Sequence, residues 1–292
     1  MRSPIALPLL FPMLALLVLL PVSCGEVDTG KPHKLLEQGW EYYRAGEYAP
    51  ALKAFQRAER LNKKDPELAL KIDYALATTW NLRRPGNDTA KARAYYQAIL
   101  DKAPRHDLAA WTLLALARLL HVIPSDQKPD YPAMRLAYQR VIDAFPGHAA
   151  SDEAFLYQQT TLLATLKPAE AAQALTNVLA YMARYPQTRQ KSPLYQLVAN
   201  CHQILGNPEA RLEAEIQALK TRELDPTNPR ANFAWPIWAI ANLAEFEAGD
   251  FKTAREYYKR FLAEYPDENK TYAAQVALDR LAATEARVRA GK

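Results

Sequence analysis

A recurring arrangement of small, aromatic and apolar positions organises this chain. Its clearest copy is residues 254–266, where four apolar residues fall at i, i+4, i+7 and i+8 of one helix face: Ala254, Tyr258, Phe261 and Leu262. Charged residues occupy the other faces. Pro266 ends the segment, because proline cannot continue the helical hydrogen bonds and disfavours helical geometry at the residue before it. The pattern predicts an amphipathic helix that ends next to this proline.

The same frame recurs along most of the chain. Clear copies are Ala92, Tyr96, Ile99 and Pro104; Met134, Tyr138, Val141 and Pro146; and Ala174, Val178, Tyr181 and Pro186. Looser copies are Ala51, Phe55 and Ala58 with a later Pro66, and Ala214, Ala218, Thr221 and Pro226. The six prolines are spaced by 38, 42, 40, 40 and 40 residues. A constant period of this length predicts a solenoid or another repeat array rather than a single globular core.

Composition favours an all-α fold. Glycine accounts for only 9 of 292 residues, and no stretch of four or more residues alternates apolar and polar positions as a half-buried strand does. Each framed helix is preceded by a further helical pattern, at about 67–82, 108–122, 152–166 and 194–205, and a last one starts or kinks near Pro236. We predict about six helical hairpins, followed by a single capping helix with Ala273, Val276, Leu278, Leu281 and Val288 on its apolar side.

The N-terminal residues 1–23 have the pattern of a signal peptide. Arg2 precedes an apolar run from Ile5 to Leu20, which Pro8 and Pro12 interrupt. A permanent spanning helix usually needs about 20 apolar residues without such interruptions. Leu20–Cys24 resembles the lipobox of bacterial lipoproteins, although a proline stands where leucine is usual. The resemblance implies an acylated Cys24 as the mature N-terminus, whereas cleavage nearby by ordinary signal peptidase would give a soluble periplasmic or secreted protein.

Four parts of the chain are therefore expected: a signal peptide at 1–23, a lipidated tether at 24–33, repeats at 34–268 and a capping helix at 269–292. With Cys24 acylated, Cys201 has no intrachain partner for a disulfide, and a small buried side chain is favoured there over a reactive thiol. The mature chain would carry 36 basic and 32 acidic residues, interspersed rather than clustered. No basic stripe indicates nucleic-acid binding.

The first hairpin identifies a repeat family. Gly39, Tyr42, Gly46, Ala51, Phe55 and Ala58 occupy the positions of the tetratricopeptide repeat signature. Small side chains let the two helices approach, rings fill the gaps beside them, and glycine permits the sharp turn. A second good copy spans residues 238–266. The resemblance implies an all-α solenoid of tetratricopeptide-type hairpins, in which the first (A) helix of each hairpin lines a concave groove and the second (B) helix lies outside.

Patterns that carry catalysis are missing from the sequence. There is no G-x-G or G-x-S-x-G, and the five histidines are far apart and have no cysteine partners at zinc spacing. Carboxylate pairs such as Glu245 and Glu247 lie at i,i+2, on different helix faces. Ser151 is interpreted as a helix N-cap. We therefore expect a non-enzymatic protein without catalytic residues, metal, cofactor or small-molecule substrate.

Binding of protein partners is the remaining function class. Registering each repeat on its small residue places nine residues near the concave surface: Trp40, Tyr43, Tyr74, Thr78, Asn81, Thr112, Gln196, Asn200 and Gln203. Aromatic and amide groups suit an extended peptide, whose backbone needs hydrogen-bond partners. An alternative is that Trp40, Tyr43 and Tyr74 only pack between repeats. Lysine and arginine do not recur as a basic carboxylate clamp would require.

A lipid signal combined with B helices that end in Phe-Pro or Tyr-Pro resembles the BamD/YfiO family of outer-membrane assembly lipoproteins. It is also similar to the repeat domain of the Tol-Pal-associated cell-division coordinator. The resemblance implies a scaffold held by lipid at the periplasmic face of the outer membrane, which gathers envelope proteins for assembly. Alternatives are a pilotin-like lipoprotein, a protein of Tol-Pal-linked cell division, and a docking partner of a peptidoglycan enzyme.

Overall fold

The computed structural model describes residues 31–81, 88–123, 125–224, 228 and 231–291. Within them it contains thirteen α-helices and no β-strand, which confirms the all-α prediction. The expected signal peptide, Cys24 and most of the expected tether lie outside the described residues. Pro32 and His33, assigned to the tether from the sequence, form the start of the first helix.

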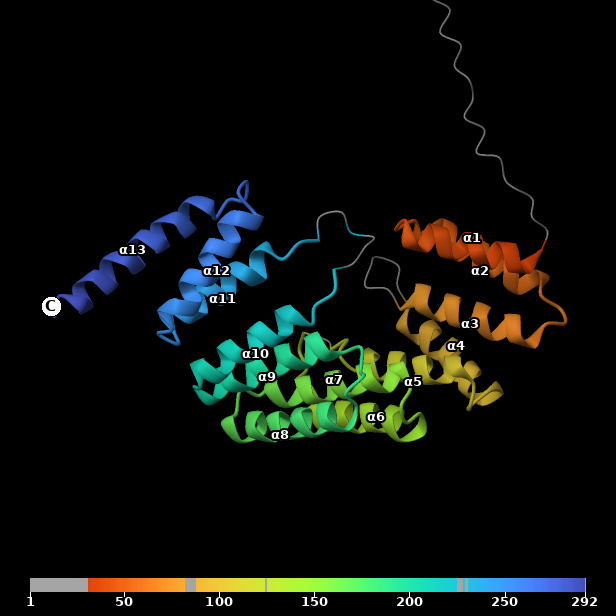
Figure 1. Ribbon diagram of the computed structural model, residues 1–292. Coiled ribbons are helices and arrows are strands. Elements are labelled where there is room, and N and C mark those ends of the chain that lie inside the picture. The colour runs from red at the N-terminus through yellow and green to blue at the C-terminus, as the bar shows by residue number, and fades with distance from the viewer. Residues whose placement is uncertain (1–30, 82–87, 124, 225–227, 229–230, 292) are drawn as a thin grey trace, which may run out of the picture.

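The described helices form six hairpins and a final single helix (Figure 1). The A helices are α1 (Pro32–Arg44), α3 (Pro66–Trp80), α5 (Asp107–Leu119), α7 (Ala149–Leu163), α9 (Lys191–Leu205) and α11 (Ala234–Phe246). The B helices are α2 (Tyr48–Leu61), α4 (Thr89–Lys102), α6 (Tyr131–Ala144), α8 (Pro168–Arg184), α10 (Pro208–Lys220) and α12 (Phe251–Glu264). The final helix is α13 (Thr271–Arg289).

Contacts between repeats divide the stack into two layers. From α1 to α9, each A helix packs against the A helix of the next hairpin as well as against its own B helix. Each B helix packs on the A helix that follows it. The α11–α12 hairpin joins the stack through α10 and lies beyond the linker that follows that helix (Figure 1). The A helices therefore form a continuous inner layer over the first five hairpins.

The repeating frame of the sequence is the core of this stack. The residues at its first position, five alanines and one methionine, are at most 5% exposed: Ala51, Ala92, Met134, Ala174, Ala214 and Ala254. Its second position is equally buried: Phe55, Tyr96, Tyr138, Val178, Ala218 and Tyr258. The third position is less uniform, because Tyr181 and Thr221 remain partly exposed. Each B helix thus buries the same stripe against its neighbours, as the period predicted.

The prolines act through the residue before them. Ala103, Phe145, Tyr185 and Tyr265 cap the ends of their B helices with φ between −123° and −148° and ψ between 57° and 66°. This geometry lies outside the α region, which a following proline disfavours at the residue before it. In all four turns the carbonyl of this residue accepts a hydrogen bond from the backbone N–H three residues later. The residue before the proline therefore gives the same turn after four B helices.

Two assignments made from the sequence are wrong in detail. Pro66 does not end α2, which stops at Leu61; it is the first residue of α3, a favourable place because its missing N–H has no helical partner there. Ser151 does not cap α7, because His148 does so with its ring. The Ser151 hydroxyl instead donates to the carbonyls of Val141 (3.1 Å) and Phe145 (2.7 Å), tying α7 to the end of α6.

The final helix packs on α12 through a stripe that matches the prediction at Leu281 and in part at Leu278 but not elsewhere. Its buried residues are Ala274, Ala277 and Leu281, whereas Val276 and Val288 are 39% and 68% exposed. An ion pair fixes its position: Arg280 donates from Nε and Nη2 to the Glu245 carboxylate at 2.7 and 2.8 Å. The Tyr258 hydroxyl donates to the same carboxylate at 2.8 Å. This buried acid therefore joins α11, α12 and α13.

Gly39 provides a test of the close approach within the first hairpin. A Cβ placed on Gly39 would lie 2.3 Å from Cε1 of the Phe55 ring. We expect Gly39→Ala to destabilise the chain by about 1–3 kcal/mol in urea unfolding, because the helices or the ring must shift. In a Phe55→Leu background, which removes the ring edge, the same change should cost less. Equal costs in both backgrounds would contradict the contact as the cause.

The Glu245 pair provides a second test, of α13. Arg280→Ala leaves a carboxylate with only 5% exposure of its side chain and no cation, so we expect a loss of about 3 kcal/mol in urea unfolding. Arg260→Ala is the matched control, since Arg260 pairs with Glu264 on the surface of α12 and should contribute less than about 1 kcal/mol. Similar losses for both variants would show that the buried pair does not hold α13.

Candidate partner-binding surface

Seven of the nine residues predicted to face the groove line two pockets formed mainly by A helices. The first pocket takes Tyr43, Tyr74, Thr78 and Asn81 from α1 and α3 and the end of α3. The second takes Gln196, Asn200 and Gln203 from α9. The remaining two, Trp40 and Thr112, lie elsewhere. The register based on small residues thus brings most of these side chains together in two places on one layer.

The first pocket, called here the tyrosine pocket, has a volume of about 510 Å³. Besides the four predicted residues it is lined by Tyr96 of α4 and by Ala115, Arg118 and Val122 of α5 and its end. Tyr96 was assigned to the core, and its ring is indeed buried. Its ring packs edge-on against Tyr74, with the centroids 6.1 Å apart. A buried core ring therefore also forms part of the pocket wall.

The tyrosine pocket is lined by neutral hydroxyl groups and by one cation, Arg118, which is paired with a carboxylate. Burial raises the pKa of Tyr74 to about 12, with a smaller contribution from Tyr96, and burial also raises the pKa of Tyr43 and of Tyr96. Arg118 donates to Glu153 at 3.2 Å and lies over the ring of Tyr157. These hydroxyls remain protonated at neutral pH and can donate or accept hydrogen bonds.

Trp40 and Thr112 have mainly structural contacts. The Trp40 ring packs edge-on against Phe55 and Tyr43, with centroids 5.2 and 5.3 Å apart, so these ring contacts lie within the first hairpin. Trp40 remains partly exposed. Thr112 is fully buried, and its hydroxyl has no hydrogen-bond partner among the described residues. It offers no surface to a partner in this conformation.

The second pocket, called here the amide groove, lies along α9 and the C-terminal half of α7 and has a volume of about 710 Å³. Asn200 and Gln203 are exposed, and Gln196 is exposed while donating to Glu215 at 2.8 Å. Its apolar lining was not predicted and comes from both helices and the turn after α7: Leu156, Leu163, Ala164, Leu166, Leu197 and Ile204. Leu166, an apolar residue in a turn, is the one signal that could have indicated it.

No group of three His, Cys, Asp or Glu side chains that could hold a metal ion occurs in the part of the chain that the structure describes. Cys201 is buried within α9, and burial raises the pKa of its thiol to about 11. Among the described helices none combines the length and the apolar character needed to cross a membrane.

Comparison with known proteins gives the repeat type. The tetratricopeptide repeat model matches residues 75–106 and 238–268, which include α4 and nearly all of the α11–α12 hairpin. A search of curated proteins finds no match. Two segments of the chain thus carry the repeat by sequence.

Solved structures of low identity share the architecture. PilW, described as a widely conserved type IV pilus biogenesis factor, is 15% identical with a TM-score of 0.52, over 86% of this chain and 97% of PilW. PilF of Pseudomonas aeruginosa is 13% identical with a TM-score of 0.52, over 87% and 97%. A chain of the APC/C hetero-tetramer Cut9-Hcn1 is 14% identical with a TM-score of 0.52, over 87% of this chain and 44% of that chain. These likenesses show the fold, a tetratricopeptide-type helical solenoid.

The tyrosine pocket predicts a specific response to alkali. Because the pKa of Tyr74 is about 12 in the folded chain and about 10 when unfolded, its contribution to stability is complete below about pH 10 and is lost towards pH 12. Tyr74→Phe should therefore lower the slope with which the free energy of unfolding falls between about pH 10 and pH 11.5. Urea unfolding at several pH values measures it. Tyr272→Phe, at a tyrosine that is 81% exposed, should keep the parent slope.

Proposed function

We propose that this chain is a non-enzymatic scaffold, held by lipid at the periplasmic face of the outer membrane, that binds extended segments of envelope proteins on its A-helix surface. The observation that carries the proposal is the position of the two pockets. Both open on the inner layer of helices, and both combine apolar or aromatic walls with uncharged hydrogen-bonding groups. Such a lining suits a peptide whose backbone and apolar side chains are both recognised.

The distribution of charge supports the same surface. The six A helices together contain 13 charged side chains, of which seven lie in α1 and α3. The six B helices contain 24, of which eleven lie in α10 and α12 and two in α8. Charged groups are thus more numerous on the outer layer, and the difference is largest in the C-terminal half, where the amide groove lies. The inner layer can lose its water to a partner at lower cost.

The two pockets also differ from enzyme sites in their chemistry. The tyrosine pocket contains hydroxyls, one amide and one arginine that is already paired, without a histidine or carboxylate among its lining residues that could act as a base. The lining of the amide groove has no charged residue. A hydrolytic role would need an activated nucleophile and a base within hydrogen-bond reach.

The proposed location at the outer membrane rests on the N-terminal sequence. The lipobox-like segment before Cys24 and a glycine rather than an aspartate at position 25 support an acylated, outer-membrane protein. More than one acyl chain gives stable membrane anchoring. The Phe-Pro and Tyr-Pro ends of α6, α8 and α12 support the resemblance to outer-membrane assembly lipoproteins. Pilus or secretin assembly is the second candidate, since the pilus biogenesis factor PilW has the same fold along 97% of its length.

Crosslinking in the native host tests the proposal. Full-length protein and a Cys24→Ala variant would be crosslinked in membranes and purified, and the attached proteins identified by mass spectrometry. We expect a barrel-assembly protein, recovered from the parent and lost or reduced with the variant. Recovery of a secretin, or of division and cell-wall proteins, would replace this reading with the corresponding alternative. A variant that stays in the membrane with the same partners would overturn the lipid anchor.

A further inference from the structure

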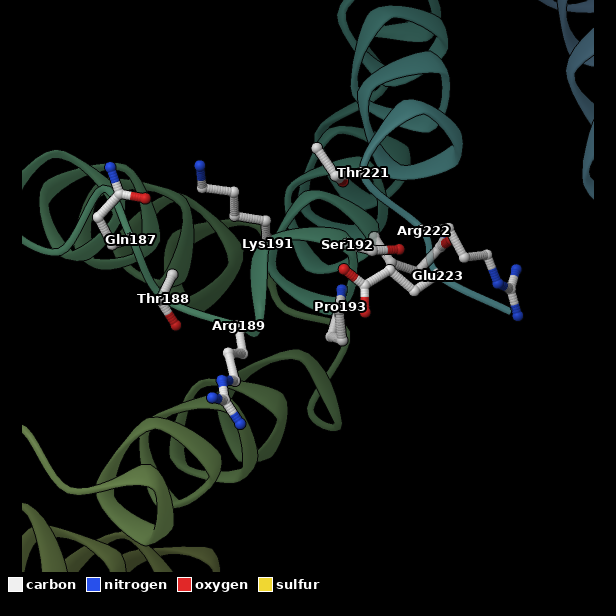
Figure 2. A pocket seen from close by; sticks show the side chains of 10 residues that line it. Gln187, Thr188, Arg189, Lys191, Ser192, Pro193, Thr221, Arg222 and Glu223 are labelled. Carbon is white, nitrogen blue, oxygen red and sulfur yellow. The ribbon is translucent and has the colours of Figure 1, made fainter. Parts of the chain in front are cut away.

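The amide groove continues at its N-terminal end into a third pocket, of about 680 Å³. The two share Pro193 and Gln196, so they form one surface along α9. The third pocket is lined by the turn before α9 and by the segment after α10, as Figure 2 shows. The combined surface is basic at the start of α9 and apolar at its end, which restricts the segments that can bind to it.

The end at the start of α9 is basic. Three cations line it, Arg189, Lys191 and Arg222, against one anion, Glu223. Arg189 precedes α9 and Lys191 is its first residue; in Figure 2 their side chains extend in opposite directions, and Arg222 reaches away from both. Helix α9 also begins without an acidic residue in its own first turn and without a side-chain cap, so Glu223 is the one acidic residue among the described residues that line the pocket at the positive end of its dipole. This end favours a negative group.

The opposite end is apolar and contains a strained residue. Leu166 follows α7 with φ of 55°, in the left-handed region, and its side chain is 73% exposed. Three of the other turns between A and B helices have glycine in this conformation: Gly46, Gly206 and Gly249. A leucine in the left-handed region strains the backbone, and its exposed side chain leaves apolar surface in contact with water. Its side chain lines the amide groove with Leu163 and Ile204.

The amides lie between the two ends. Gln196, Asn200 and Gln203 form one stripe of α9, because they fall at i, i+4 and i+7. Each carboxamide has a donor and an acceptor, which match the N–H and C=O of an extended backbone. At about 1.5 Å per residue, Pro193 to Gln203 spans about 15 Å, which an extended chain covers in four to five residues at about 3.3 Å each.

We propose that this surface binds an extended, acidic-apolar segment of a partner protein: a large aliphatic side chain packs against Leu166, and an Asp or Glu side chain four residues away lies in the basic end that Arg189 and Lys191 line. The inference rests on the proposed function, and it names the segment that the scaffold recognises. Leu166 supplies apolar contact, the amides of α9 fix the backbone, and the basic end sets which sequences bind.

Defined peptides test the recognition directly. The probes are acetylated, C-terminally amidated and fluorescently labelled peptides in which leucine and glutamate are separated by three Gly or Ser residues, in both orders. Binding to full-length protein is measured by fluorescence anisotropy at low and moderate salt. We expect saturable binding of one order. It should weaken at least about fivefold when glutamate becomes glutamine or leucine becomes serine, and the glutamate-dependent part should fall with salt.

Variants of the protein separate binding from folding. Leu166→Gly relieves the left-handed leucine, so it should be at least as stable as the parent in urea while weakening the peptide at least about fivefold. Arg189→Ala with Lys191→Ala should remove the discrimination between glutamate and glutamine. Leu136→Ala is the matched control, because Leu136 is also exposed, at 57%, but lies on the B helix α6 outside the groove. It should bind as the parent does.

The outcomes also separate this inference from the function on which it rests. If Leu166→Gly binds the peptides normally, or if all probes bind alike, the recognition of an acidic-apolar segment is wrong. If no probe binds while crosslinking still recovers envelope partners, the scaffold stands and this surface is not its docking site. If the probes bind as expected and crosslinking recovers no envelope protein, the site stands and the assignment to envelope assembly fails.

Discussion

The contact on which the whole structure depends is the one between the buried stripe of each B helix and the small residues of the helices around it. A single hairpin cannot cover that stripe alone, because each B helix also packs on the A helix of the next hairpin. The described core accordingly consists of clusters that each join consecutive helices, such as α1–α3, α3–α5 and α7–α10. The constant spacing of the prolines preserves this stacking, because each turn must return the chain at the same angle.

The same contact determines where a partner can bind. The B helices use one side for the core and the other for charged groups, whereas the A helices are covered by their B partners and by one another and leave a single free side. Three tyrosines at the second frame position extend from the B helix towards the A helix of their own hairpin. Tyr96 lines the tyrosine pocket, Tyr138 bonds His121 at 2.7 Å, and Tyr258 bonds Glu245. Their rings are buried in the core, while their hydroxyls lie beside residues of the A helices or of the helix ends.

Features that follow from a local rule could be predicted from the sequence. The helical class, the buried frame and the proline turns depend on the order of residues within a single hairpin and recur with the period of the repeat, and they appear as expected at Tyr138 and Ala254. Features that depend on a neighbouring repeat could not. Ser151 has the composition of a cap, but its hydroxyl faces the carbonyls of α6, because the preceding turn already places His148 at the cap. The predicted stripe of α13 was right only in part, with Leu281 buried but Val276 and Val288 exposed, since α12 decides which side of α13 is buried.

The candidate site shows the same limit. A register on small residues placed Asn200 and Gln203 on the A-helix surface, but it could not show that α7 contributes apolar walls beside them. Leu166 is the informative exception, because local preference and position disagree there: an equivalent turn in three other hairpins has glycine. A solenoid gains nothing in its core from an exposed leucine in the left-handed region. Where a residue costs the fold and contributes no packing to it, an external contact is the physical reason that remains, and the groove that Leu166 borders is where that contact would lie.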